Sequence, residues 1–165
     1  MSRVYRILRK PYAQSPFDGE GAYRYGGRWS SPGTRLVYAS EHQSLAMLEY
    51  FVHLDADDPP PELVLAIADV PDDLNREQIR IEKLPANWRL SPAPPELAKI
   101  GDAFVQDAKR AILLVPSVLS PSENNWLLNP AHADFKKITV RATEALTYDS
   151  RMLPAGHRAR KRKAK

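Results

Sequence analysis

One apolar segment constrains the fold of this chain more than any other feature of its sequence. Residues 63–70 read Leu-Val-Leu-Ala-Ile-Ala-Asp-Val and are apolar at every position but one. A strand with one face in water alternates apolar and polar residues, whereas a nearly continuous apolar run is typical of a strand in the middle of a sheet. The segment therefore predicts an internal strand around which the other elements are arranged.

Other segments supply neighbours for this strand. Their apolar runs and alternation predict strands over residues 4–8, 35–39, 78–84, 111–115 and 136–142, with a short segment over residues 124–128. Residues 11–34 are rich in Gly, Pro, Ser and Asp and predict a long loop, which is usually functional or disordered. The order contains more strand than helix, and it lacks the βαβ regularity of a doubly wound fold.

Two segments are predicted to be helical. The first spans residues 43–53, and Ser40 with Gln43 fits a capping box at its start. The second spans residues 95–110, where Pro95 suits the first turn of a helix. We expect these helices to cover the predicted sheet.

The length and composition suit one domain. The chain has 165 residues, 43% of them hydrophobic and 27% charged, which is enough for one core and too little for two. Cysteine is absent, so a disulfide framework and a thiolate metal site are excluded. No apolar run is long enough to span a membrane or to form a signal peptide. We therefore expect a cytoplasmic protein without membrane contact.

The net positive charge of the chain comes from its C-terminal residues. Seven of the 24 basic residues and none of the 20 acidic residues lie in positions 151–165, so positions 1–150 hold 17 basic and 20 acidic residues. We expect a domain over residues 1–147 and a basic, disordered tail over residues 148–165. A slightly acidic body is a poor scaffold for nucleic acid, although a nucleic-acid-binding effector that uses the tail stays open as an alternative.

A glycine-rich turn is the first candidate for chemistry. In Gly26-Gly27-Arg28-Trp29, the two glycines allow the backbone to approach a ligand closely, and the arginine can form a two-pronged contact with phosphate oxygens. The pattern matches neither GxGxxG nor the P-loop, so those nucleotide-binding folds are not indicated. A hairpin turn with a surface arginine is the alternative interpretation.

Glu49 lies at the edge of an apolar helix stripe. At about 100° per residue, Leu45, Leu48 and Val52 form the stripe, and Glu49 lies about 40° from Leu45. A carboxylate in this position is neither plainly solvated nor plainly buried. Partly buried carboxylates are normally paired or functional, so Glu49 is a candidate site residue.

Tyr38 and Ser117 are weaker candidates when each is taken alone. Tyr38 lies in a predicted strand, where a core aromatic is the ordinary interpretation. Ser117 directly follows a buried strand, at a position where open sheets often place ligand-binding groups. No GxSxG elbow surrounds it, so a nucleophilic serine is not indicated. No cluster of His, Asp and Glu has metal-ligand spacing, and His132 suits a turn or capping role.

Six motifs, in order along the chain, resemble the RES domain, a family named for its Arg, Glu and Ser. They are Phe17-Asp18-Gly19-Glu20-Gly21, Gly26-Gly27-Arg28-Trp29-Ser30, Val37-Tyr38-Ala39, Ser44-Leu45-Ala46-Met47-Leu48-Glu49, Val115-Pro116-Ser117 and Asn125-Trp126-Leu127-Leu128-Asn129-Pro130-Ala131-His132. The resemblance runs from about residue 3 to residue 142. Two departures are small, since Ser30 stands where Asn is common and Ala133 where Pro is common.

The resemblance implies a fold and a biological role. The fold is a single α+β domain related to the ADP-ribosyltransferases, with a split, strongly bent sheet and surrounding helices. The role is that of a toxin whose Xre-type antitoxin closes the active-site cleft, so nucleic acid is contacted only indirectly, through the antitoxin. Similar toxins destroy NAD⁺ by hydrolysis or phosphorolysis, and some relatives transfer ADP-ribose to a protein. NAD⁺ is then the substrate, and no separate cofactor or metal is implied.

The resemblance also assigns a site, residue by residue. The catalytic positions are Arg28, Tyr38 and Glu49, and the substrate-binding positions are Ser117, Arg6, Gly27 and Asn125. A degenerate domain that only binds a partner is disfavoured, because the Arg, Tyr, Glu and Ser positions are all filled.

The residue types suit cleavage of the nicotinamide–ribose bond. Cleavage develops positive charge on the ribose, which Glu49 would stabilise more in the transition state than in the ground state. Arg28 would hold the diphosphate with two-pronged contacts, and Tyr38 would stack on the nicotinamide with its hydroxyl free. Ser117 would hydrogen-bond the substrate without attacking it. Nicotinamide leaves as a neutral molecule, so no general acid is needed.

Overall fold

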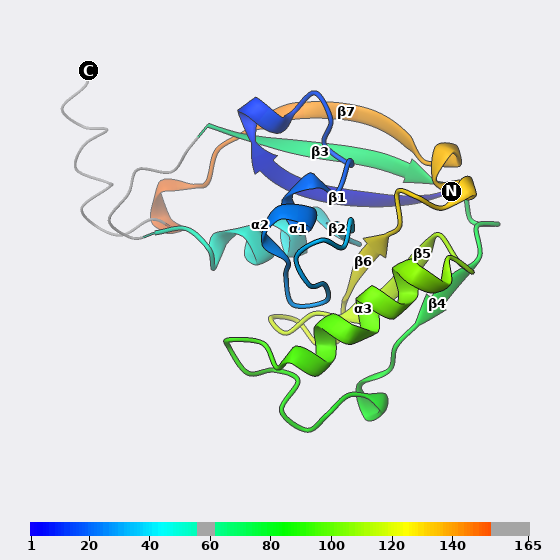
Figure 1. Ribbon diagram of the computed structural model, residues 1–165. Coiled ribbons are helices and arrows are strands. Elements are labelled where there is room, and N and C mark those ends of the chain that lie inside the picture. Colours follow the sequence, from blue (N-terminus) through cyan, green and yellow to red (C-terminus); the bar gives the residue numbers. More distant parts are fainter. Residues whose placement is uncertain (56–61, 153–165) are drawn as a thin grey trace, which may run out of the picture.

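The protein is organised around one mixed sheet (Figure 1), which has seven strands in the described residues, in the order β4-β5-β6-β2-β1-β3-β7. The computed structural model describes residues 1–55 and 62–152. The strands are β1 (Ser2–Arg9), β2 (Val37–Ser40), β3 (Leu63–Val70), β4 (Arg76–Gln78), β5 (Ile112–Pro116), β6 (Asn124–Leu128) and β7 (Thr139–Leu146). Neighbouring strands are antiparallel except β4 and β5, which are parallel.

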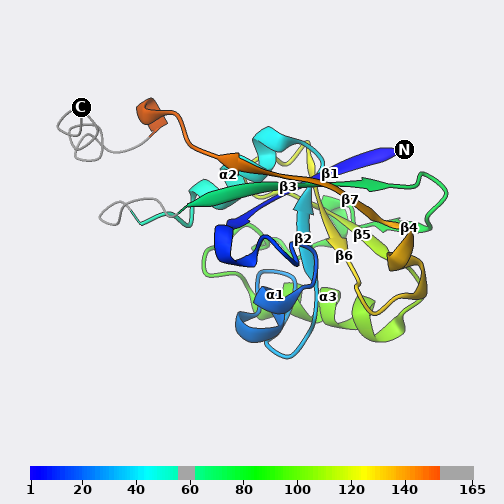
Figure 2. The same ribbon diagram turned by 90° about the horizontal axis from the view of Figure 1, so that it is seen from above.

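Three α-helices and four short 3₁₀ helices accompany the sheet in residues 1–55 and 62–152. They are α1 (Glu20–Tyr25), α2 (Gln43–Phe51) and α3 (Pro95–Asp107), with η1 (Lys10–Tyr12), η2 (Ile81–Lys83), η3 (Ala133–Lys137) and η4 (Ser150–Met152). Seen from above, α2 lies on one side of the strands β1, β3 and β7, and α1 and α3 lie on the other side (Figure 2). Among the described helices, none is long and apolar enough to cross a membrane. The predicted α+β class is confirmed.

The apolar run over residues 63–70 forms β3, which lies between β1 and β7. Its even-numbered residues from Val64 to Val70 pack into one hydrophobic cluster, while Leu63 and Leu65 pack into another with Ala46 of α2. Both faces of β3 are therefore covered, as its continuous apolar sequence requires. The predicted internal strand is confirmed.

The sheet is nearly divided in two between β1 and β2. β1 pairs with β3 along its whole length, whereas it pairs with β2 only at Tyr5 and Ser40. Figure 1 shows β1, β3 and β7 running together across the top, with β4, β5 and β6 running obliquely below them. The split, bent sheet that the resemblance implies is confirmed, and the bend leaves a gap in the backbone ladder.

Two predicted elements differ from those observed. Residues 11–34 contain α1 as well as loop, and the Asp18 carboxylate accepts a hydrogen bond from the Glu20 N–H over 2.9 Å at its start. The strand expected over residues 78–84 is instead β4, which ends at Gln78, followed by η2. The chain leaves the sheet after the Ile79 N–H donates to the Leu114 carbonyl, so the later alternation lies on a 3₁₀ turn.

The start of α2 also differs from the prediction. The capping box of Ser40 and Gln43 is wrong, because Ser40 is the last residue of β2 and its hydroxyl donates to Asn125. His42 is the N-cap, in extended conformation and without a side-chain cap bond. Ser40, which matched the pattern of a helix cap, therefore hydrogen-bonds across the sheet to Asn125 instead.

The buried face of α2 is narrower than the expected stripe. Leu45 and Ala46 are buried, whereas Leu48 and Val52 are exposed. The helix packs on β1 and β2 through the face that carries Leu45 and Ala46, so the other half of the stripe is left outside the core. Glu49 is half-buried, as its position at the edge of the stripe predicts.

The packed part of the chain extends beyond the predicted boundary at residue 147. Tyr148 is buried, and its hydroxyl donates to the Met47 carbonyl over 2.6 Å. Its ring also packs on Phe51 with the ring centroids 5.5 Å apart. The chain is therefore tied to α2 at Tyr148, which corrects the expectation that it frays after Thr147. Most of the expected basic tail, residues 153–165, lies outside the described residues.

Candidate active site

A cleft opens where the two halves of the sheet separate. Its volume is about 900 Å³, within the range of small-molecule sites. β1, β2 and α2 contribute walls, together with the segment over residues 25–29. Six of the seven predicted site residues line this cleft: Arg6, Gly27, Arg28, Tyr38, Glu49 and Asn125. Ser117 does not line it, although both of its chain neighbours do.

The Glu49 carboxylate is held through one of its two oxygens. Oε1 accepts hydrogen bonds from the Ser117 hydroxyl over 2.7 Å and from the Asn125 side-chain amide over 2.6 Å. Oε2 accepts no hydrogen bond from the described residues, and it is not among their buried unpartnered atoms. Oε2 is therefore the oxygen that faces the open cleft, while Oε1 fixes its orientation.

Ser117 is fully buried, and all of its hydrogen-bonding capacity is used. Its hydroxyl donates to Glu49 and accepts from the N–H groups of Leu119 and Ser120 over 3.0 and 3.1 Å. A hydroxyl has one hydrogen and two acceptor sites, so none is left for a ligand. In this structure Ser117 therefore supports the Glu49 carboxylate, and its predicted bond to the substrate stays a prediction.

Arg28 faces the cleft and also fastens a loop. Its Nη1 donates to the carbonyls of Trp88 and Leu90 over 2.8 and 3.1 Å, and its Nη2 donates to Leu90 over 3.1 Å. Burial lowers the pKa of Arg28, and the nearby Glu49 carboxylate opposes that shift. The guanidinium therefore lies within electrostatic reach of Glu49 while holding residues 88–90 against the cleft.

Tyr38 supports the turn that carries Arg28. Its hydroxyl accepts from the Trp29 N–H over 3.0 Å and bonds the Ser30 hydroxyl over 2.8 Å, so it is not free as expected. A Cβ atom on Gly27 would lie 2.7 Å from the same hydroxyl, which explains the glycine at this position. Burial raises the pKa of Tyr38 to about 12, so the phenol stays protonated at neutral pH.

Arg6 is a partly buried cation that lines the cleft. Its Nη1 donates to the Tyr38 carbonyl over 3.2 Å, and its Nε is buried without a partner among the described residues. Burial lowers the pKa of Arg6, and the charges of Asp18 and Tyr38 oppose that shift. No carboxylate in the described chain forms a salt bridge with Arg6, so its charge is available to an anionic ligand.

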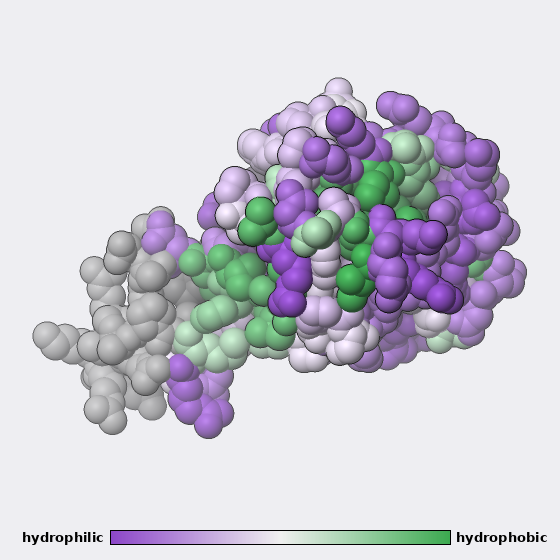
Figure 3. Space-filling model, turned by 90° about the horizontal axis from the view of Figure 1, so that it is seen from below, coloured by the Kyte–Doolittle hydropathy of each residue, from purple (hydrophilic) through white to green (hydrophobic). Residues whose placement is uncertain are grey.

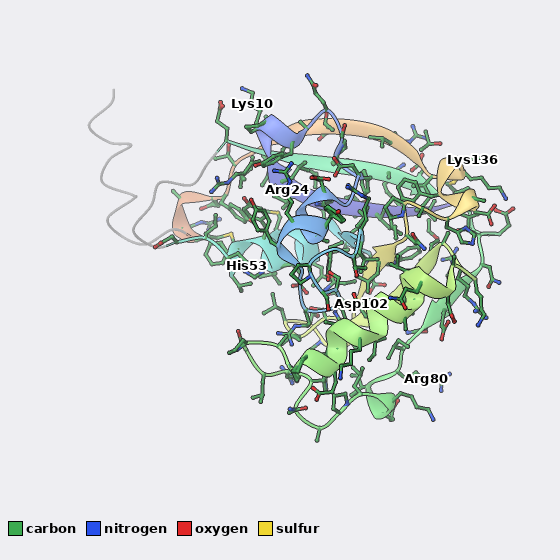
Figure 4. All side chains as sticks on the ribbon, in the orientation of Figure 1. Lys10, Arg24, His53, Arg80, Asp102 and Lys136 are labelled. Carbon is green, nitrogen blue, oxygen red and sulfur yellow. The ribbon has the colours of Figure 1, made fainter. Side chains whose placement is uncertain are left out.

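Sequence reasoning missed several cleft residues. Tyr5, Tyr50 and His53 line the cleft as well, from β1, α2 and the end of α2. Figure 4 labels His53 below α2. His53 follows α2, whose last residue is Phe51, so helical spacing from Glu49 does not reach it and no local pattern indicated it.

The turn that carries Arg28 is seated on α3. The Asp102 carboxylate, labelled on α3 in Figure 4, accepts a hydrogen bond from the Ser31 N–H over 2.9 Å. At Gly101, a Cβ atom would lie 1.7 Å from the Trp29 carbonyl oxygen, so the backbones meet directly. These contacts join residues about 70 positions apart along the chain, which no local pattern reveals.

One group of side chains in the described residues has the donors of a metal site. Ligand atoms of Glu41, His42 and Glu123 lie within 4.8 Å of one another. His42 Nδ1 and Glu123 Oε1 already hydrogen-bond over 2.7 Å, and both Glu41 oxygens bond to Asn124. The local sequence showed no metal-ligand spacing, because Glu123 comes from a distant segment.

Exposed apolar side chains gather at the mouth of the cleft. Tyr25, Val52 and Leu119 line it with exposed fractions of 81%, 54% and 40%, and Leu90, 59% exposed, precedes the lining residue Ser91. Figure 3, which views the molecule from below, shows hydrophobic patches interspersed with hydrophilic surface. These four residues are here called the apolar rim, and exposed apolar side chains beside a cleft are typical of a binding surface.

Comparisons with known proteins place the chain in a family. Residues 3–149 match the model of the RES domain. The chain is 38% identical over 146 residues to the Prs ADP-ribosylating toxin of Sphingobium sp. strain YBL2, covering 87% of this chain and 91% of that protein. It is 39% identical over 133 residues to Toxin Res of Yersinia enterocolitica, covering 81% and 87% of the two chains.

A solved structure shares the fold. A chain of the M. tuberculosis MbcT–MbcA toxin–antitoxin complex superposes with a TM-score of 0.72 at 18% identity, covering 88% of this chain and 84% of that one. The fold, the ordered motifs and the family match agree over the same residues. The protein is a member of the RES domain family.

Proposed function

We propose that this protein is the toxin of a toxin–antitoxin system and that it cleaves the nicotinamide–ribose bond of NAD⁺. The observation that carries the proposal is an accessible carboxylate oxygen on Glu49 in the same cleft as the cations Arg6 and Arg28. NAD⁺ has the complementary chemistry, with a ribose that gains positive charge during cleavage and a diphosphate that is negative. The toxin names of its relatives support the biological role.

Glu49 is the electrostatic centre of the proposed reaction. As the bond to nicotinamide breaks, the electron pair leaves with the nicotinamide, and the ribose becomes an oxocarbenium-like cation. A carboxylate oxygen fixed beside this cation stabilises it without reorganising, because two donors already hold the other oxygen. The leaving nicotinamide is neutral, so the step needs no proton donor.

Two arginines divide the task of holding the diphosphate. Arg6 offers a positive charge without a salt-bridge partner in the described chain, and an anion in the cleft would relieve the cost of burying it. Arg28 keeps residues 88–90 in place and adds its charge beside Glu49. The Tyr38 ring contributes through its face, since its hydroxyl is bonded to the turn.

The acceptor of the ADP-ribose group defines two versions of this function. Attack by water or inorganic phosphate at the ribose carbon destroys NAD⁺ outright. A protein side chain as acceptor makes the protein an ADP-ribosyltransferase, and the printed name of the Sphingobium relative favours this second candidate. Both versions use the same cleavage step and the same residues.

An antitoxin partner is part of the proposal. The structure that shares this fold is that of a toxin–antitoxin complex. The apolar rim gives such a partner a surface to cover, and a carboxylate of the partner would complement the cations inside the cleft. We expect an Xre-type antitoxin that competes with NAD⁺ for the cleft and carries any contact with nucleic acid.

One experiment tests the function directly. The purified protein is incubated with NAD⁺, with and without inorganic phosphate, and the products are followed by ¹H and ³¹P NMR. Release of nicotinamide with ADP-ribose or its 1″-phosphate supports hydrolysis or phosphorolysis. Release of nicotinamide only when cell lysate is added, with ADP-ribose bound to one protein band, supports transfer. If no nicotinamide is released under any condition, the proposal is wrong.

A further inference from the structure

A chain of hydrogen bonds continues behind Glu49 into the sheet. The Ser40 hydroxyl donates to the Asn125 side-chain oxygen over 2.8 Å, and the Asn125 side-chain nitrogen donates to Glu49 Oε1 over 2.6 Å. Ser40 is buried, and it is the register partner of Asn125 between β2 and β6. It is also the β2 residue that pairs with β1, opposite Tyr5, at the junction of the two half-sheets.

The chemistry of the three groups fixes the direction of this chain. An ionised carboxylate only accepts hydrogen bonds, so Asn125 must present its NH₂ group to Glu49. The amide oxygen then points to Ser40, whose hydroxyl has to donate. If the amide rotated by half a turn, its oxygen would face a carboxylate oxygen. The carboxylate disfavours that rotation, and the Ser40 hydroxyl stabilises the observed orientation by donating to the amide oxygen.

We propose that Ser40 is a positioning residue for Glu49, acting through the Asn125 amide. Its catalytic consequence rests on the proposed function, since Glu49 is the group that meets the ribosyl cation. With Ser40 in place, Asn125 and Ser117 hold Oε1 from two directions and Oε2 is aimed into the cleft. Ser40 and Asn125 lie on paired strands, which hold a site more rigidly than loops do.

The kinetic test uses Ser40→Ala with Ser44→Ala as the matched control. Ser44 is an exposed serine on the first turn of α2, and its hydroxyl bonds to no described residue. Loss of one positioning hydrogen bond should lower kcat for NAD⁺ cleavage about threefold to tenfold and leave KM unchanged. Ser44→Ala should match the wild type. An unchanged kcat in folded Ser40→Ala, or an equal loss in Ser44→Ala, would contradict the proposal.

A double-mutant cycle shows whether Ser40 acts through Asn125. In an Asn125→Ala background the amide is gone, so adding Ser40→Ala should lower kcat no further. Additive losses would show that Ser40 acts by another route. Ser40→Thr and Ser40→Val give a second comparison of equal volume, in which only the threonine keeps the hydroxyl. The threonine variant should have the higher kcat, and equal values would overturn the inference.

A spectroscopic readout separates this inference from the proposed function. In ¹H–¹⁵N spectra, the Asn125 amide protons, assigned with Asn125→Asp, should include one shifted downfield by its bond to the carboxylate. Glu49→Gln and Ser40→Ala should each move that signal, whereas Ser44→Ala should not. A wild type that leaves NAD⁺ intact but shows these shifts would overturn the function and keep the positioning. A wild type that cleaves NAD⁺, with an Asn125 signal unchanged in Ser40→Ala, would overturn the positioning alone.

Discussion

Ser117 donates the single hydrogen of its hydroxyl to Glu49 across 68 positions of sequence and 2.7 Å of space. The same hydroxyl accepts two backbone N–H groups of the segment that follows it, so it is tied to that segment on one side and to α2 on the other. This arrangement makes the serine part of the support for the carboxylate. Ser117 is also fully buried and does not line the cleft, so its hydroxyl is not presented to a ligand as a nucleophile would be.

Ser117→Ala should therefore weaken the reaction without ending it. Glu49 keeps the Asn125 donor, and we expect kcat for NAD⁺ cleavage to fall about tenfold with KM little changed. Steady-state kinetics at saturating NAD⁺ measure the effect, with circular dichroism confirming the fold. A complete loss of turnover in a folded variant would show that the serine takes part in the chemistry.

Glu49→Gln should have a much larger effect than Ser117→Ala. The substitution keeps the size of the side chain and removes the negative charge that stabilises the ribosyl cation in the proposed reaction. We therefore expect a loss of roughly 10²–10³ in kcat and of toxicity in cells. Glu96→Gln, on the exposed face of α3, is the control. Near-normal turnover of Glu49→Gln would remove this residue from the mechanism.

Arg6→Met should separate binding from stability. Met fills most of the volume and removes a cation that has no ion-pair partner in the described chain, so the free energy of unfolding should not fall. Binding of NAD⁺ should weaken by about 1.5–3 kcal/mol, the range of a charged hydrogen bond. Calorimetric titration with a non-cleavable NAD⁺ analogue and urea unfolding measure the two quantities. Normal affinity would show that Arg6 does not hold the diphosphate.

Arg28→Lys should loosen a loop as well as weaken binding. A lysine keeps the charge but cannot bond the Trp88 and Leu90 carbonyls from two nitrogens. We expect faster amide hydrogen exchange over residues 88–91 and NAD⁺ affinity lower by ~1.5–3 kcal/mol. Arg24→Lys, an exposed ion-pair residue outside the cleft, should change neither. Unchanged exchange in Arg28→Lys would show that the loop is held by other contacts.

Gly101→Ala should destabilise the protein because α3 and the Arg28 turn touch there. The added Cβ would meet the Trp29 carbonyl oxygen at 1.7 Å, so the backbones must separate. We expect the free energy of unfolding to fall by about 1–3 kcal/mol. The control is Gly21→Ala in α1, where a Cβ meets nothing within 4 Å and should be neutral or stabilising. Equal stability of the two variants would contradict this packing.

Sequence patterns predicted those parts of the structure that depend only on residues close together in the chain. The run over residues 63–70 needs cover on both faces wherever it lies, so its internal position in the sheet follows from composition alone. Glu49 is half-buried for a similarly local reason, its angle on the helix. The ordered motifs predicted seven site residues, and six of them line one cleft.

The rest depends on contacts between distant segments, which no window of sequence contains. The Ser40 hydroxyl matched a helix cap, but its strand partner Asn125 lies 85 residues away and takes its hydrogen bond. The sequence predicted that the Arg28 side chain is free to bind phosphate. The structure shows that it donates to the carbonyls of Trp88 and Leu90, about 60 residues later. The short helix α1 within residues 11–34 was predicted as loop. Glycines stand at both of its ends, and Gly19 and Gly26 both have positive φ.

The interruption between β1 and β2 has an effect on charge as well as on shape. In a continuous ladder, the Tyr38 carbonyl of β2 would accept a hydrogen bond from the backbone of β1. Here it accepts one from the side chain of Arg6, which belongs to β1. A partly buried cation is stabilised by a backbone carbonyl dipole, and the Tyr38 carbonyl beside the interrupted ladder supplies one to Arg6. The interruption of the sheet between β1 and β2 thus lies next to the arginine that the proposed function assigns to the diphosphate.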